Sequence, residues 1–333
     1  MTGLPMADIR IIPLAEVDQT LTDGIFDEQC QEWISKLRWD YFEPSRLLRG
    51  VLRKGELTGL IAITNSATGE AAAGGFSFYV VEGTRASIGD IYVSARHRGS
   101  GIDRELLLAI LSKLETLPRL RRIESQSVSF DNRGAEQVFL SRGFERFERR
   151  FMIAPLSTDA VPRSVLEDAQ LATGPGTIRI RSWQEDDYGA TVRTILRSYR
   201  GEDDSRINSQ YDSEEGCAEL LSILTDTVWC GRFLPEASRV AACSVTGNQV
   251  GVLIASQMSP DTAHLGQISV LPVYQGRGIG RRLIQSAKAE LSTRGFTGAS
   301  LAVTATNSRA VSLYESCGFS TIHSFPVYFW RRK

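Results

Sequence analysis

A glycine-rich turn near residue 275 has the residue types that bind phosphate. Residues 270–281 read Val-Leu-Pro-Val-Tyr-Gln-Gly-Arg-Gly-Ile-Gly-Arg, between a β-rich run and a helical pattern. The glycines leave successive backbone N–H groups unshielded, and the following helix places about +0.5 elementary charge at its N-terminus. Such a turn can hold phosphate or pyrophosphate, and Arg277 and Arg281 add positive charge. The sequence therefore predicts a phosphate site here.

Two common phosphate motifs do not fit this turn. A dinucleotide fingerprint requires a third glycine where Leu283 stands, and a P-loop requires a lysine that does not follow here. The remaining alternative is an ordinary glycine-rich turn that caps a helix.

A second motif lies further along the chain. Residues 307–319 read Asn-Ser-Arg-Ala-Val-Ser-Leu-Tyr-Glu-Ser-Cys-Gly-Phe. Together with Gln275-x-x-Gly278-x-Gly280, it resembles the paired motifs of the GNAT superfamily of N-acetyltransferases, Q/R-x-x-G-x-G/A and N-x-x-A-x-x-[LF]-Y-x-x-x-G-F. The resemblance implies that an acetyl group moves from acetyl-CoA, the cosubstrate, to a primary amine by direct attack in a ternary complex. No metal is expected, because the three histidines are not at metal-ligand spacing.

The resemblance also implies roles for individual residues. Backbone groups of Ile268, Ser269 and Val270 would pair with the pantetheine arm, and the amide near Val270 would polarise the thioester carbonyl. Asn307 would contact the cofactor near its pantetheine. Tyr314 would protonate the departing thiolate, since a phenol with a pKa near ~10 matches its basicity; the alternative is a residue that only packs on the core. The residues implied to hold the pyrophosphate are Gln275, Gly276, Arg277, Gly278, Ile279, Gly280 and Arg281.

The general base is not identified by the sequence. Some relatives carry Glu five residues before the motif Asn, where this chain has Ala302, and Gln267 and Ser269 occupy the strand before Val270. The segment 200–215 lies where the family builds its acceptor pocket, and its acidic residues suit a cationic amine. The alternative is that this segment is a solvated loop. The candidates for the base are His264 and water relayed to Tyr211, Glu214 or Glu215.

The chain also contains an internal repeat. Its blocks recur in the same order, which indicates duplication. The aligned pairs are residues 9–18 with 178–187, residues 91–102 with 268–279, and residues 132–144 with 307–319. We expect an α/β fold of two tandem GNAT domains with mixed sheets: an N-terminal domain at 1–155, a linker at 156–176 and a catalytic domain at 177–333. A short helix is predicted at 164–170, within the linker.

The N-terminal copy differs at the chemical positions. Arg98-x-x-Gly101 retains the first half of the cofactor signature, but Asp103 stands where the second copy has Gly280. A carboxylate repels pyrophosphate, and Phe139 replaces the tyrosine of the second motif. The first copy is therefore expected to support the second, which alone would be active. The architecture resembles that of mycothiol synthases, tandem members of the superfamily with a catalytic C-terminal half.

Secondary structure in the C-terminal copy follows from its hydrophobic periods. The predicted strands are 177–181, 239–246, 249–258, 264–270, 299–304 and 328–330. The predicted helices are 188–199, 213–225, 280–294 and 308–316.

Composition excludes several other classes of protein. The chain has 38 basic and 39 acidic residues, so it lacks the basic surface of nucleic-acid-binding proteins. Five scattered cysteines and three histidines without metal-ligand spacing indicate reduced thiols and no zinc site. We expect a cytoplasmic monomer or homodimer without a nucleic-acid or membrane partner, whose acceptor amine is unidentified. The alternative function is a non-catalytic acyl-CoA-responsive binding or scaffold protein.

Overall fold

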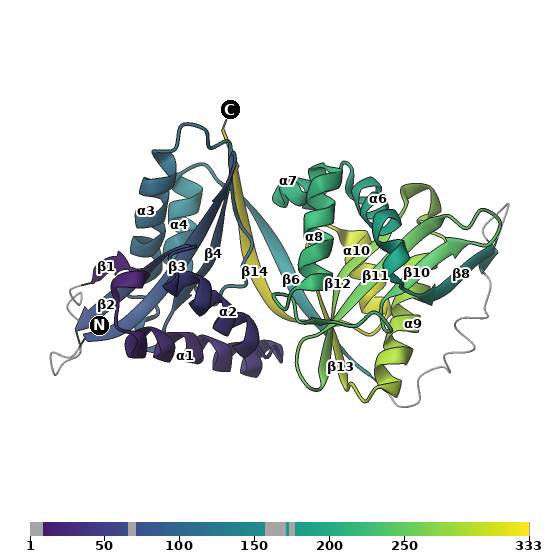
Figure 1. The fold of residues 1–333 in the computed structure, drawn as a ribbon, viewed down its shortest axis with the longest axis horizontal. Helices are drawn as coiled ribbons and strands as arrows, with labels where there is room; N and C mark the ends of the chain where they lie inside the picture. Colours follow the sequence, from purple (N-terminus) through teal and green to yellow (C-terminus); the bar gives the residue numbers. More distant parts are fainter. Residues whose placement is uncertain (1–8, 66–70, 157–170, 173–176, 333) are drawn as a thin grey trace. The chain divides into compact units, whose positions relative to one another are not determined.

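The computed structural model describes residues 9–65, 71–156, 171–172 and 177–332 (Figure 1). The chain forms two compact units that do not follow its sequence halves. The first unit takes residues up to 35, residues 41–148 and the C-terminal segment from 325, and the second takes 36–40 and 149–324.

The first unit has a mixed sheet with helices on both faces. Its strands, in order across the sheet, are β1 (Arg10–Pro13), β2 (Thr58–Asn65), β3 (Ala71–Glu82), β4 (Arg85–Val93), β5 (Arg122–Ser125) and β14 (Ser320–Arg331). Only β4 and β5 run parallel. Its helices are α1 (Gln19–Leu37), α2 (Phe42–Arg53), α3 (Ile102–Glu115) and α4 (Arg133–Ser141), with 3-10 turns η1 (Leu14–Glu16) and η2 (Ala95–His97).

The second unit repeats this arrangement. Its strands, in order, are β8 (Thr177–Ser182), β10 (Arg239–Cys243), β11 (Gln249–Gln257), β12 (Thr262–Val270), β13 (Gly298–Thr304) and β6 (Glu145–Pro155). Again only the fourth and fifth, β12 and β13, run parallel. Its helices are α6 (Tyr188–Tyr199), α7 (Asp203–Ile207), α8 (Glu214–Asp226), α9 (Ile279–Thr293) and α10 (Ser308–Ser316). The short elements are β7 (Leu171–Ala172), β9 (Arg232–Phe233), η3 (Glu185–Asp187), η4 (Ser209–Asp212) and η5 (Pro272–Tyr274).

The last strand of each sheet comes from the other repeat, which corrects the predicted domain bounds. Strand β13 pairs with β6 from Gly298 opposite Pro155 to Thr304 opposite Arg149. Strand β14, at the end of the chain, pairs with β5. The predicted bounds kept each strand in its own half because repeat alignment reveals order along the chain, not pairing. Strand β7 lies within the predicted linker, whose predicted helix at 164–170 falls outside the described residues.

Apolar side chains bury both faces of the second sheet. On one face, Leu253 and Leu301 share a buried cluster with Leu283 of α9. On the other face, Val252 shares a cluster with Ile195 of α6 and residues of α8. These helices can be followed on the sheet of the second unit in Figure 1. Helices therefore cover both faces of the second sheet.

Candidate active site

Strands β12 and β13 separate after three residue pairs. Their parallel register runs from Thr262 opposite Gly298 to His264 opposite Ser300 and continues no further. Beyond this point, residues of both strands line a cavity of about 600 Å³, which we call the second-unit cavity. The backbone groups of β12 that would face a continued β13 are therefore available to a ligand that pairs as a strand does.

A β-bulge accompanies the separation. Ile254 of β11 lies opposite Gln267, but the next residue, Ala255, lies opposite Leu265, so Gly266 is an extra residue. A Cβ atom on Gly266 would come within 2.9 Å of Leu224 Cδ2, so a larger residue there would require this leucine to move. Bulges bend a strand and change the direction of its side chains, and this one lines the second-unit cavity.

The glycine turn opens directly into this cavity. Gly276 and Gly278 have φ of 75° and 78°, a left-handed conformation that favours glycine, and Gly278 caps α9 without any side chain. The N-terminus of α9 is thus open to an anion. The predicted cofactor residues that line the cavity are Ile268, Ser269, Val270, Gln275, Gly276, Gly278, Ile279, Gly280, Arg281 and Asn307.

Arg277 is the exception among the predicted cofactor residues. It is absent from the cavity lining, and its guanidinium lies over the Tyr274 ring, 5.6 Å from the centroid. A cation–π contact holds it there. Arg309 was not among the predicted cofactor residues. It nevertheless lines the cavity and donates a hydrogen bond to Gln275 Oε1. Gln275 in turn donates to the carbonyl of Val270 at 3.0 Å, so the turn is tied to the end of β12.

Tyr314 lines the second-unit cavity from α10. The helix begins at Asn307, whose Oδ1 accepts a hydrogen bond from the Ala310 amide at 3.1 Å. Tyr314 is 9% exposed, and its ring meets Phe319 edge-on at 6.2 Å. Burial, and after it the neighbouring Tyr199 and Asp204, raise the pKa of Tyr314 well above its ordinary value. The phenol is therefore protonated at neutral pH and has a proton available to donate.

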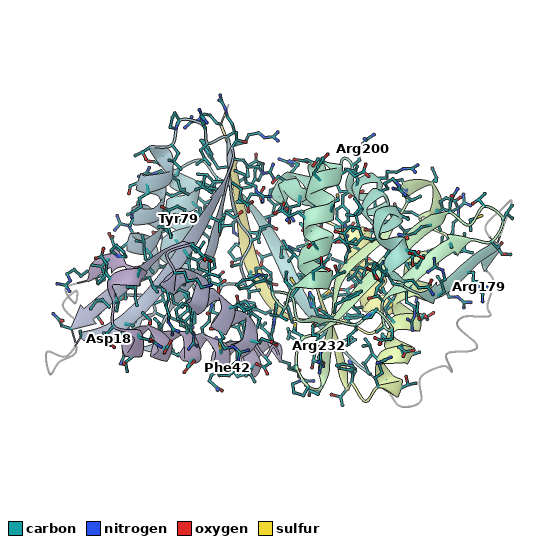
Figure 2. The ribbon with its side chains drawn as sticks, in the orientation of Figure 1. Asp18, Phe42, Tyr79, Arg179, Arg200 and Arg232 are labelled. Atoms are coloured by element: carbon teal, nitrogen blue, oxygen red, sulfur yellow. The ribbon has the colours of Figure 1, made fainter. Side chains whose placement is uncertain are left out.

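Acidic side chains reach the same cavity from the segment after α6. Arg200, labelled in Figure 2, marks the end of α6. Glu202 and Asp204 line the cavity just beyond it. Asp204 Oδ1 accepts a hydrogen bond from Thr304 Oγ1 at 2.8 Å, which fixes the carboxylate beside the end of β13. The sequence pointed to this acidic segment but not to these two residues.

A pair of stacked tyrosines also lines the second-unit cavity. The rings of Tyr199 and Tyr211 lie 3.9 Å apart at an angle of 2°, and both line the cavity. Tyr211 donates a hydrogen bond to Gln267 Oε1 at 3.2 Å. Burial is the main cause that raises the pKa of both phenols. Tyr211 is thus neutral and unsuited to act as a base.

The chain is similar in sequence to known acetyltransferases. The model of the acetyltransferase (GNAT) family matches the chain twice, at residues 16–144 and 202–319. The chain belongs to the GNAT family. Mycothiol acetyltransferase of Beutenbergia cavernae is 30% identical over 245 residues, which cover 70% of this chain and 73% of that protein. This relative and the two matches of the family model confirm that the chain contains two GNAT repeats in tandem.

Other relatives match one repeat or the fold alone. The [ribosomal protein bS18]-alanine N-acetyltransferase of Salmonella typhimurium is 40% identical over 73 residues, 22% of this chain, and the match spans about half, 49%, of that relative. The crystal structure of a GCN5-related N-acetyltransferase from Sphaerobacter thermophilus has a TM-score of 0.65 at 18% identity, covering 99% of this chain and 97% of that one. A tandem GNAT protein from the clavulanic acid biosynthesis pathway has a TM-score of 0.59 at 14% identity, with coverages of 97% and 98%. These two structures show the fold.

The three other base candidates do not line the second-unit cavity. His264 is buried, stacks on Trp39 and Phe151, and shares a hydrogen bond of 3.0 Å with Ser300 Oγ. Burial, with a smaller effect from Arg149, lowers the pKa of His264 to about 4. The histidine does not line the cavity, so this candidate is not placed to act as the base. Glu214 and Glu215 are exposed in the first turn of α8 and do not line the cavity either.

The corresponding cofactor groove of the first GNAT repeat is filled by its own side chains. Asp103 is buried and accepts a hydrogen bond from the Ala135 amide at 2.8 Å, so it occupies the N-terminus of α4. Asn132 donates to the carbonyl of Ile91 at 2.6 Å, a backbone group equivalent to one expected to pair with pantetheine. The cavity there measures about 20 Å³.

The residues of the first repeat that correspond to Gln275 and Tyr314 also contact other side chains. Arg98, which corresponds to Gln275, forms an ion pair with Glu32. Phe139, which corresponds to Tyr314, stacks on Tyr328 with ring centroids 4.1 Å apart. These contacts support the expectation that this repeat is structural.

The described residues lack two further features. No helix among them is long and apolar enough to cross a membrane. In the same part of the chain, no group of three or more His, Cys, Asp or Glu side chains could hold a metal ion.

Proposed function

We propose that this protein is an N-acetyltransferase that moves an acetyl group from acetyl-CoA to a primary amine in a ternary complex. The second unit carries the reaction. The observation that supports this most strongly is the placement of a buried, neutral Tyr314 in the same cavity as the open glycine turn. A protein that only binds acyl-CoA has no need of a proton donor at this position.

The cavity residues divide the work between binding and chemistry. The glycine turn and Arg281 hold the pyrophosphate, and the end of β12 pairs with the pantetheine arm. The amide near Val270 polarises the thioester carbonyl. Asp204 attracts the ammonium form of the acceptor. The Asp204 carboxylate then passes a proton of this ammonium to water, which leaves a neutral amine.

The reaction then balances in one displacement. The amine nitrogen forms a bond to the acetyl carbonyl carbon, and the bond from that carbon to sulfur breaks. Tyr314 gives its proton to the departing thiolate and recovers one from solvent, and the attacking nitrogen releases its extra proton to solvent, so the products are the acetylated amine and the CoA thiol. Since the pKa of Tyr314 is raised by burial, its proton is held until a strong base, the thiolate, develops beside it.

An amine panel tests the proposal. Acetyl-CoA is incubated with the full chain and one amine at a time, and free CoA and the acetylated product are measured together. We expect at least one amine to release CoA and form product in equal amounts. Tight acetyl-CoA binding with no product from any amine would instead support a non-catalytic binding protein.

A further inference from the structure

Arg149 brings an unpaired cation to the second-unit cavity. It stands on β6 opposite Thr304 of β13, and its side chain lines the cavity. Its Nε atom is buried and makes no hydrogen bond, and no ion pair among the described residues includes this arginine. By contrast, Arg150 lies near Glu315, with 3.9 Å between nitrogen and oxygen. A partly buried guanidinium without an anion is costly, so a ligand anion is the natural partner for Arg149.

The position of Arg149 is at the reacting end of the cavity. Arg149 lines the same cavity as Tyr314 and Tyr211, and its positive charge opposes the rise in pKa that burial causes in both phenols. The glycine turn has cations of its own, since Arg281 and Arg309 line the cavity there. Arg149 is therefore not required for the pyrophosphate and is available to the acceptor.

A fixed carboxylate lies close to this cation. Thr304, the strand partner of Arg149, donates a hydrogen bond to Asp204 Oδ1 at 2.8 Å. Asp204 and Arg149 both line the cavity, yet they form no ion pair with each other. The acceptor end thus presents one negative and one positive group, both associated with Thr304, which complements a molecule that carries both charges.

We propose that the acceptor is a small amine that also carries a carboxylate. Arg149 binds the carboxylate through its guanidinium, which matches that group with two parallel hydrogen bonds. Asp204 binds the ammonium. The inference rests on the proposed acetyltransferase function and names the substrate class of the same site.

Matched acceptors test this inference. The probes are α-, β- and γ-amino acids, each compared with its methyl ester, which keeps the amine and removes the negative charge. We expect kcat/KM to be about 10-fold or more higher for the best acid than for its ester, because truncating one partner of a charge pair costs this much or more. Arg149→Gln should remove the preference, and Arg149→Lys should restore part of it.

Arg150→Gln is the matched control on the same strand, and it should retain the preference. Equal kcat/KM for acids and esters in the unmodified protein would overturn the inference. So would an Arg149→Gln variant that loses activity equally on both, since that result indicates a structural role.

Binding measurements separate this inference from the proposed function. Calorimetric titration with the same acids and esters, in the presence of CoA, reads the preference without turnover. Preferential binding of acids that depends on Arg149, with no acetylation of any amine, would reject the acetyltransferase and retain the site. Failure of every acid to bind would reject the site.

Discussion

A fragment of residues 177–333 is expected not to fold, although it contains both GNAT motifs. The fragment lacks β6, which pairs with β13 over seven residue pairs from Gly298–Pro155 to Thr304–Arg149. Phe151 and Met152 of β6 are 1% and 0% exposed. Loss of these two side chains alone costs about 5–10 kcal/mol, whereas a whole domain is stable by only about 5–15 kcal/mol. Circular dichroism and thermal melting measure the outcome.

A longer fragment, residues 149–333, is the matched control. It restores the strand that completes the second sheet and should recover cooperative melting and acetyl-CoA binding. A cooperative melt of residues 177–333 equal to that of the longer fragment would show that β6 is dispensable. The exchange of last strands between the two repeats would then contribute nothing to the stability of the second unit.

Tyr314→Phe is expected to lower kcat by roughly 10²-fold. The change removes one hydroxyl from a side chain that is 9% exposed, and the ring contact with Phe319 at 6.2 Å does not need that hydroxyl. Folding and acetyl-CoA affinity should therefore change little. Because the proton moves only in the transition state, the loss should appear in kcat more than in KM. Steady-state kinetics on any acceptor that turns over gives both values.

Tyr79→Phe is the control for this substitution. Tyr79 lies on β3 of the first unit, is labelled in Figure 2, and does not line the second-unit cavity. Its loss should leave kcat unchanged. If Tyr314→Phe also leaves kcat unchanged while chemistry limits the rate, Tyr314 is not the donor, and water supplies the proton.

The local features of the site could be predicted from the sequence. The turn at Gly276 and Gly278 and the start of α10 at Asn307 depend on glycine conformation and on a helix cap, both determined by residues close in the chain. Most predicted helices and strands of the second repeat end within a few residues of their observed ends for the same reason.

The residues that the sequence did not reveal depend on contacts between distant segments. Arg149 reaches the cavity only because β6 pairs with β13, and no local pattern encodes that pairing. His264 looked like a base by residue type, but packing against Trp39 buries it away from the cavity. Asp204 was one of several acids in its segment, and its hydrogen bond with Thr304 distinguishes it.

Calorimetric titration of the full chain with acetyl-CoA tests the central claim most directly, namely that the second repeat alone holds the cosubstrate. The second-unit cavity of about 600 Å³ is open at its glycine turn, whereas the equivalent space in the first unit measures about 20 Å³ and the Asp103 carboxylate occupies the N-terminus of α4. We therefore predict one binding site per chain. Two sites would contradict the account of the first repeat, and no binding at all would contradict the account of the second.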